Sequence, residues 1–295
     1  MRKEIVYILF SILLVFSACK EQSVTLNPGG GSSNTGGDSS TLPRNVLVEE
    51  YTGASCPNCP SGHEIMAALR AQYGTRLQVI AVHPMDLNFL QAKPEPGHTY
   101  DFRSVIGYTM QRAIYGSLSF MPSVGIDRLQ YGGPLLDPSG IGDIISSEMA
   151  DTTGTVYLSV SSSFNATTDS AKIQATVIWV KGDSSNKNLS IALVEDSLVD
   201  IQDSLTILVP NYVFNNVFRD LITDNSQVEG VRLLPNATSI SKGTVDLVTI
   251  PYKVNIGVIN GDNHVVNPRR CRVIAYITNR NTHKVVQSAE CPLVQ

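Results

Sequence analysis

The sequence lacks a basic cluster. Acidic residues outnumber basic ones by 26 to 22 in a chain of 295 residues, and the formal net charge is −4. The densest basic stretch, Arg269-Arg270 with Arg272, is typical of a solvated strand end. Because nucleic acids are bound through clustered positive charge, this composition argues against nucleic acid as a partner.

Also absent is an apolar run that could span a membrane as a stable helix. The run at 5–16 is too short, and it follows Arg2-Lys3, a pattern typical of an export signal. It ends in Phe16-Ser17-Ala18-Cys19, which resembles a bacterial lipobox, although Phe16 stands where leucine is usual. We expect a lipoprotein signal peptide at 1–18 and a lipid on Cys19 that binds the chain to a membrane. An ordinary signal peptide cleaved nearby is the alternative.

Core-forming residues are missing from the segment that follows. Residues 27–43 read NPGGGSSNTGGDSSTLP, with Leu42 as the only large apolar side chain. This composition predicts a flexible coil, so we expect 19–43 to be a lipidated tether. Lys20-Glu21-Gln22, directly behind Cys19, resembles the surface-export signal of Bacteroidetes lipoproteins.

Cysteine is scarce, with five residues in the chain. Cys19 takes the lipid, and export to an oxidising compartment leaves two pairs that can form disulfides, Cys56 with Cys59 and Cys271 with Cys291. The register that we expect for the final hairpin places Cys271 opposite Cys291, so we predict a structural disulfide there. Two reduced, buried thiols are the alternative.

The chain is organised around Cys56-Pro57-Asn58-Cys59. This stretch lies between a strand pattern at Val46–Tyr51 and a helical pattern at 60–73 that ends at Gly74. A C-x-x-C at a strand-to-helix junction indicates a thioredoxin-like redox motif. The reason is local, since the free N–H groups and the macrodipole of a helix N-terminus stabilise a thiolate.

The elements around this motif predict an α/β domain at 44–151. A second strand at Leu77–Val82 is expected to run parallel to the first. The further elements that we expect are a helix at 102–115, a strand at 124–127 with a hairpin partner at 129–131, and a helix at 141–149.

From residue 152 on, short strands separated by turn signals predict an all-β domain at 152–295. The expected strands are 156–160, 172–180, 189–194, 244–252, 272–278 and 284–289. This spacing favours an immunoglobulin-like antiparallel β-sandwich. The segment 212–223 suits either a helix or a strand with a bulge, and Trp179 is expected in the sandwich core.

Several of these features resemble known proteins. Residues 46–59 look like the active-site strand and loop of the thioredoxin fold, and Met121-Pro122 resembles the cis-proline of that fold. The lipobox and tether, the pattern Y-T-G-x-x-C-x-x-C-P-x-G-H and the later NYVFNNVFR together resemble the Bacteroidetes twenty-eight-kilodalton outer-membrane-protein-related family. This resemblance implies an outer-membrane or surface lipoprotein, facing the periplasm or the exterior, in a family discussed as antigenic and adhesin-like.

The resemblance also implies roles for four residues. Cys56 would be the nucleophile, Cys59 would resolve the mixed disulfide, and Pro122 would orient a protein or peptide substrate. Glu50 would be the buried acid that exchanges a proton with Cys59. Glu49 points to the opposite face of the strand, and only one of the two acids can serve.

Other side chains are candidates for the same cleft. His63 follows the motif by one helical turn, and His83 and Asp86 stand at the C-terminal end of a parallel strand. Phe120 and Met121 flank the proline and offer apolar contact to a peptide. Because the histidines and cysteines lack a known ligand spacing, we predict neither a metal nor a cofactor.

Two functions from different classes remain open. One is envelope thiol–disulfide exchange at the C-x-x-C. The other is a non-catalytic, adhesin-like surface protein whose C-x-x-C forms a structural disulfide. Ser55 stands where many thioredoxins have tryptophan, and no cationic residue is adjacent, which weakens the enzyme hypothesis.

Overall fold

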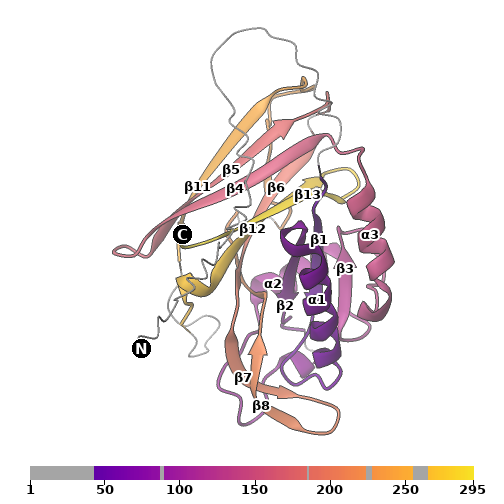
Figure 1. Cartoon of the computed structure of the whole chain (residues 1–295), viewed down its shortest axis with the longest axis vertical. Coiled ribbons are helices and arrows are strands. Elements are labelled where there is room, and N and C mark those ends of the chain that lie inside the picture. The colour runs from indigo at the N-terminus through magenta and orange to yellow at the C-terminus, as the bar shows by residue number, and fades with distance from the viewer. Residues whose placement is uncertain (1–42, 87–89, 185, 224–227, 255–264) are drawn as a thin grey trace, which may run out of the picture. The chain divides into compact units, whose positions relative to one another are not determined.

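The computed structural model describes residues 43–86, 90–184, 186–223, 228–254 and 265–295 (Figure 1). The predicted signal peptide, the lipidation site Cys19 and almost all of the predicted tether lie outside these residues. The described residues belong to one compact unit.

An eight-stranded mixed sheet forms the centre of this unit. Its order is β13-β12-β6-β9-β2-β1-β3, and β10 pairs with β6. Its strands are β1 Val46–Tyr51, β2 Leu77–Val82, β3 Ser123–Ile126, β6 Lys187–Glu195, β9 Val217–Leu221, β10 Val231–Arg232, β12 Cys271–Asn279 and β13 Val285–Pro292. Strands β1 and β2 are parallel, as predicted, and β3 is antiparallel to β1.

Two smaller antiparallel sheets complete the strands. The first has the order β11-β5-β4, and the second is the hairpin β7–β8. Their bounds are β4 Val156–Asn165, β5 Ser170–Trp179, β7 Leu198–Asp203, β8 Leu208–Phe214 and β11 Val245–Lys253. An α/β part followed by an all-β part is therefore present, as predicted.

Three α-helices lie in the first half of the described chain. They are α1 Cys59–Tyr73, α2 Val105–Ile114 and α3 Gly142–Ala150. The Ser104 hydroxyl caps α2 by accepting a hydrogen bond from the Gly107 N–H. Gly74 ends α1 at φ 57°, a conformation that glycine adopts at little cost. Short 3₁₀ helices cover Gly74–Arg76, Leu90–Ala92, Pro138–Gly140 and Pro268–Arg270.

Side-chain alternation along β1 divides the core between the two faces of the large sheet. Val46 and Val48 pack with Met66 of α1 and Ile145 of α3. Leu47 on the opposite face packs in the cluster that contains α2 side chains. Because both faces are covered by helices, β1 and β2 are buried along their whole length.

The all-β part of the core lies between β4-β5-β11 and the β6-β12-β13 end of the large sheet. Trp179 of β5 is fully buried there, as predicted. The cluster also contains Ile191 of β6 and Val273 of β12. The β4-β5-β11 sheet therefore packs on strands that belong to the central sheet.

The large sheet continues across the boundary that the sequence predicts between Asp151 and Thr152. Strand β9 from the second half pairs with β2 from the first, with Ala81 opposite Val217. An unpaired β2 would expose backbone N–H and C=O groups, and β9 satisfies some of them. The α/β part and the all-β part thus share one hydrogen-bonded sheet.

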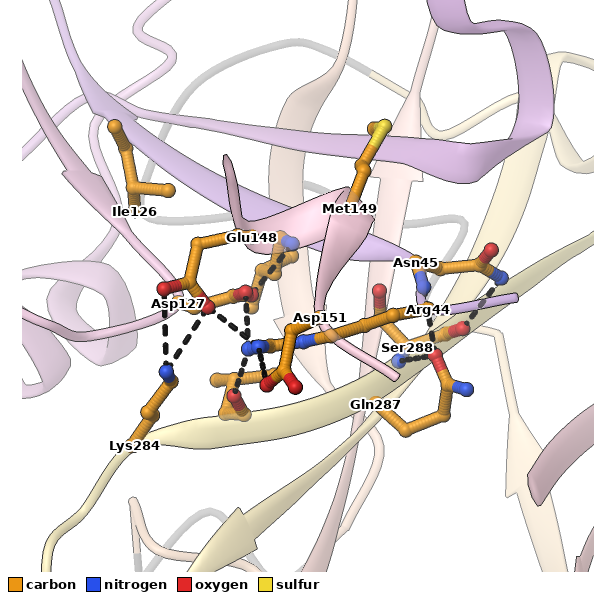
Figure 2. Close-up of polar contacts among 12 residues, drawn as sticks. Arg44, Asn45, Ile126, Asp127, Glu148, Met149, Asp151, Lys284, Gln287 and Ser288 are labelled. Carbon is orange, nitrogen blue, oxygen red and sulfur yellow. Dashed lines mark hydrogen bonds and ion pairs between the residues drawn. The ribbon is translucent and has the colours of Figure 1, made fainter. Parts of the chain in front are cut away.

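A buried ion-pair cluster also joins the two parts (Figure 2). Arg44 Nη2 lies 2.8 Å from Asp127 Oδ2, and Arg44 Nη1 lies 2.5 Å from Glu148 Oε2 of α3. Arg44 also donates to the carbonyl of Val285 in β13, and Lys284 pairs with Glu148 at 2.9 Å. Burial raises the pKa of Asp127 to about 7, although Arg44 opposes that shift.

Two further predictions are decided by the structure. The segment 129–131 is a turn, so the predicted hairpin partner of β3 is wrong. The ambiguous segment 212–223 contains no helix, because it holds the end of β8 and all of β9. Asn216 between these strands has φ 60°, and the chain passes from β8, the partner of β7, to β9, the partner of β6, without a helical turn.

The predicted disulfide between Cys271 and Cys291 is not formed, and both residues are buried thiols. The Asn279 N–H bonds to the Lys284 carbonyl, and a bulge follows between Ile277 and Thr278. The pairing of Asn279 with Lys284 at the turn shifts the expected register by one residue, and the bulge shifts it by one more. Cys291 consequently lies opposite Val273, and the Cys271 thiol donates to the Asn267 carbonyl at 3.3 Å.

Candidate functional site

The disulfide Cys56–Cys59 closes the turn that begins α1. Its Cα atoms are 5.4 Å apart, and the Cys59 N–H bonds to the Cys56 carbonyl at 3.1 Å. Cys59 is the first helical residue, and Pro60 follows in the first turn, where a missing N–H costs no hydrogen bond. The sulfur atoms therefore lie at the helix end that favours negative charge.

Two segments distant in sequence cover this disulfide. The Gln202 side chain of β7 donates to the Gly53 carbonyl at 3.2 Å and to the Cys56 carbonyl at 3.1 Å. The Ser55 N–H bonds to the Gln91 carbonyl at 3.0 Å. As a result Cys56 is only 2% exposed, and Cys59 is fully buried.

Gly53 is the point of closest approach for the second covering segment. A Cβ atom at this position would lie 2.3 Å from the Gln91 carbonyl oxygen. A larger residue would therefore force residues 90–92 away from the motif.

Glu50 lies beneath the first turn of α1, as predicted. It is 1% exposed, and a Cβ atom built on Gly62 would lie 3.0 Å from both Glu50 Oε1 and Pro122 Cβ. Glycine at 62 thus allows the helix, the acid and the proline to meet. The Met121–Pro122 peptide bond is cis, as the resemblance implies. Burial raises the pKa of Glu50 to about 8.

Glu49 occupies the other face of β1, also as predicted. Arg128 Nη2 lies 3.0 Å from Glu49 Oε1, and the Tyr115 hydroxyl donates to Glu49 Oε2 at 2.6 Å. The same guanidinium lies 5.0 Å from the centre of the Tyr276 ring. Glu49 is therefore fully paired within a buried network, whereas Glu50 Oε1 has no hydrogen-bond partner among the described residues.

His63 connects α1 with the covering hairpin. Its Nε2 atom lies 2.7 Å from Thr52 Oγ1, and its Nδ1 atom lies 2.7 Å from the Tyr212 hydroxyl of β8. Burial lowers the pKa of His63 to about 4, so the imidazole is neutral at pH 7. His63 therefore holds the hairpin in place and carries no charge near the sulfurs.

His83 and His63 line one cavity, and the other candidates lie elsewhere. Burial lowers the pKa of His83 to about 3. Asp86 instead accepts a hydrogen bond from Gln111 at 3.3 Å. Phe120 is 37% exposed, and Met121 is half-buried beside the proline.

Two features are absent from the residues that the structure describes. Within them, no group of three or more His, Cys, Asp or Glu side chains could hold a metal ion. No helix in this part of the chain is long and apolar enough to span a bilayer.

The family model for "Outer membrane protein Omp28" matches residues 111–291, which is more than half of the chain. This chain belongs to the Omp28 family. Membership agrees with the location predicted from the N-terminal segment, an outer membrane protein held by a lipid anchor. No curated protein matches this Omp28-family chain.

Solved structures similar to this Omp28-family chain show the fold alone. HBP35 of Porphyromonas gingivalis has 15% identity and a TM-score of 0.62, with 86% of this chain and 76% of that chain covered. Protein AGR_C_4864 from Agrobacterium tumefaciens has 15% identity and a TM-score of 0.50, with coverage of 85% and 96%. A domain of the outer membrane lipoprotein Omp28 from Porphyromonas gingivalis has 12% identity and covers 48% of this chain and 92% of its own, but its TM-score of 0.32 carries no structural argument.

Sequence reasoning did not identify the residues that cover the motif. Gln202 and Tyr212 reach the C-x-x-C region across more than 140 positions of sequence. Gln202 shares the buried face of β7 with Leu198 and Asp200, but no local pattern names its acceptors. The pairing of Asn216 and Asp196 with Arg272 was equally unforeseen.

Proposed function

We propose that this Omp28-family protein carries out thiol–disulfide exchange at the cell envelope, through a thioredoxin-like arrangement of Cys56 and Cys59. The observation that carries the proposal is the disulfide at the start of α1, above a buried acid. Glu50 and Pro122 both lie against Gly62, which is three residues beyond Cys59 in α1. With its raised pKa, Glu50 holds a proton at neutral pH that a leaving thiolate can accept.

The reaction oxidises a dithiol in a protein or peptide substrate. A substrate thiolate attacks Cys56 Sγ, which forms a mixed disulfide and breaks the Cys56–Cys59 bond. Cys59 leaves as a thiolate and takes the proton from Glu50. A second substrate thiolate then attacks the substrate sulfur of the mixed disulfide and releases Cys56. Two electrons pass from the substrate, which gains a disulfide, to the protein, which becomes a dithiol.

Trapping the mixed disulfide tests this proposal. The full-length Cys59→Ser variant cannot resolve the intermediate, so with oxidised glutathione it should gain one glutathione on Cys56, visible by intact mass and peptide mapping. The matched Cys56→Ser variant should gain far less, because Cys59 is held in the first turn of α1 whereas Cys56 precedes the helix. If wild-type protein does not equilibrate with glutathione buffers, and Cys59→Ser gains no adduct, the exchange proposal fails.

The covering of the disulfide favours a second candidate function. With Cys56 at 2% exposure and bonded through its carbonyl to Gln202, the bridge could act as a structural link. The protein would then be a non-catalytic, adhesin-like surface protein, and its β4-β5-β11 layer, on an immunoglobulin-like part, would contact a partner. In that case a Cys56→Ser/Cys59→Ser double variant keeps cell-surface binding, and the wild-type disulfide does not exchange.

A further inference from the structure

A cavity of about 340 Å³ lies beside α1, apart from the disulfide. It opens at the C-terminal ends of the parallel strands β1 and β2, an edge where α/β sheets commonly bind ligands. Glu50 at the end of β1 and His83 directly after β2 line it, and Phe214 of β8 forms part of its wall. Its volume falls within the range of small-molecule sites.

Two of the side chains that line the cavity carry buried polar atoms that the described residues do not fully satisfy. Glu50 Oε1 has no hydrogen-bond partner among the described residues, the ring nitrogens of His83 have only a weak contact with the backbone of Ala81, and each side chain is 1% exposed. Burying such groups without partners is costly, so most buried polar groups in proteins are paired. His63 shares the cavity, but its two nitrogens are already bonded to Thr52 and Tyr212.

The charges around the cavity are already balanced. At its mouth, Arg272 Nε lies 2.7 Å from Asp196 Oδ2, and Arg70 Nη2 lies 2.9 Å from Glu290 Oε1. Within it, burial keeps Glu50 protonated and His83 neutral at pH 7. A charged ligand group would therefore lose its hydration without gaining a free counter-charge.

The neutral interior defines the chemistry of a ligand. A protonated carboxyl and a neutral imidazole each offer one donor and at least one acceptor, which an amide group can match. Met66, Ala67, Val213 and Phe214 supply apolar wall for the rest of the molecule. We propose that this cavity binds a small uncharged molecule whose buried end carries an amide-like pair of hydrogen-bond donor and acceptor.

Three probes of similar shape test the proposal. Benzamide is uncharged, benzoate is an anion, and benzylamine is a cation at pH 7. Ligand-detected NMR on the full-length, disulfide-intact protein should show benzamide binding about tenfold more tightly than either charged probe, the equivalent of about 1.4 kcal/mol. His83→Phe keeps a planar ring but removes both nitrogens, and should weaken benzamide about tenfold.

A pair of surface variants keeps the test independent of folding. Ala67→Trp fills the mouth of the cavity from an exposed position on α1, whereas Ala68→Trp places the same side chain at an exposed position that does not line it. The first should abolish benzamide binding, and the second should leave it unchanged. No benzamide binding, a preference for a charged probe, or equal binding by both tryptophan variants would overturn the proposal. A Cys56→Ser/Cys59→Ser variant should bind benzamide normally, so the result does not depend on thiol exchange.

Discussion

The two faces of β1 treat neighbouring carboxyl groups in opposite ways. Glu49 pairs with Arg128 and accepts from Tyr115 within a buried network. Glu50, one residue later, has an oxygen with no partner among the described residues, next to Pro122 and the start of α1. Both side chains are at most 1% exposed, so solvent access does not distinguish them.

This contrast separates a structural role from a chemical one. A buried carboxylate that is fully paired holds structural elements together. Its removal leaves the partner charge buried and without a counter-charge. A buried carboxyl without a partner is stable only when it is protonated, which makes it a proton donor. The Glu49 face should therefore determine stability, and the Glu50 face should determine reactivity.

The largest expected effect is on the Glu49 face. Glu49→Gln leaves the buried Arg128 without its counter-charge, and should lower the free energy of unfolding by about 3–5 kcal/mol. Urea unfolding of the full-length protein at pH 7 measures this loss. Glu50→Gln is the matched control and should cost far less, because no ion pair is broken. Equal losses in the two variants would remove the distinction between the faces.

The next effect is the pH dependence carried by Glu50. Because its pKa in the folded protein is about 8, above the ordinary value of 4.5, its contribution is fully present below pH 4.5 and is lost as the pH rises through 8. Wild-type stability relative to Glu50→Gln should fall by about 2 kcal/mol between pH 5.5 and 7.5. Urea unfolding of both proteins at the two pH values measures it. A difference that stays constant with pH would show that Glu50 titrates normally.

A smaller effect concerns access to the disulfide on the Glu50 face. Gln202→Ala removes the hydrogen bonds to the Gly53 and Cys56 carbonyls, and should raise the rate of reduction by dithiothreitol about tenfold. The control is Asn211→Ala, at an exposed position on β8 of the same hairpin. If both variants are reduced at the wild-type rate, the hairpin does not limit access to Cys56.

The smallest effect is at the second cysteine pair, where the thiols face the all-β core. Burial raises the pKa of the Cys291 thiol to about 11 and also raises that of Cys271. Because only the thiolate is a good nucleophile, native protein should not react with iodoacetamide at pH 7. In denaturant without a reductant, both residues should become alkylated, as measured by peptide mass. Protection of both residues in denaturant would show that they form a disulfide after all.

Local sequence patterns predicted the elements around the motif well. Strands β1 and β2 have the bounds that were expected, and α1 begins one residue earlier. Alternation along β1 also placed Glu49 and Glu50 on opposite faces. These features depend on side chains within a few residues of one another, which a pattern of apolar positions describes directly.

Features that depend on irregular backbone were harder to predict. The register of the final hairpin differs from the expected one because the turn pairs Asn279 with Lys284 and a bulge follows between Ile277 and Thr278. Together these move each partner two residues along the facing strand, so the Cys271–Cys291 disulfide was predicted incorrectly. The spacing of residues along the sequence cannot reveal a bulge, since the residues that form it are of the types found in ordinary strands.

The sequence by itself determined the C-x-x-C motif, its placement between β1 and α1, the opposite faces of Glu49 and Glu50, and membership of the Omp28 family. Only the tertiary structure decided that β9 joins β2, that Gln202 covers Cys56, and that Glu50 and His83 share a cavity. The physical reason is that hydrogen bonds and burial act between groups close in space. Chain segments more than 100 residues apart, such as β2 and β9, are neighbours only in the complete fold, so no local pattern of residues records their contact.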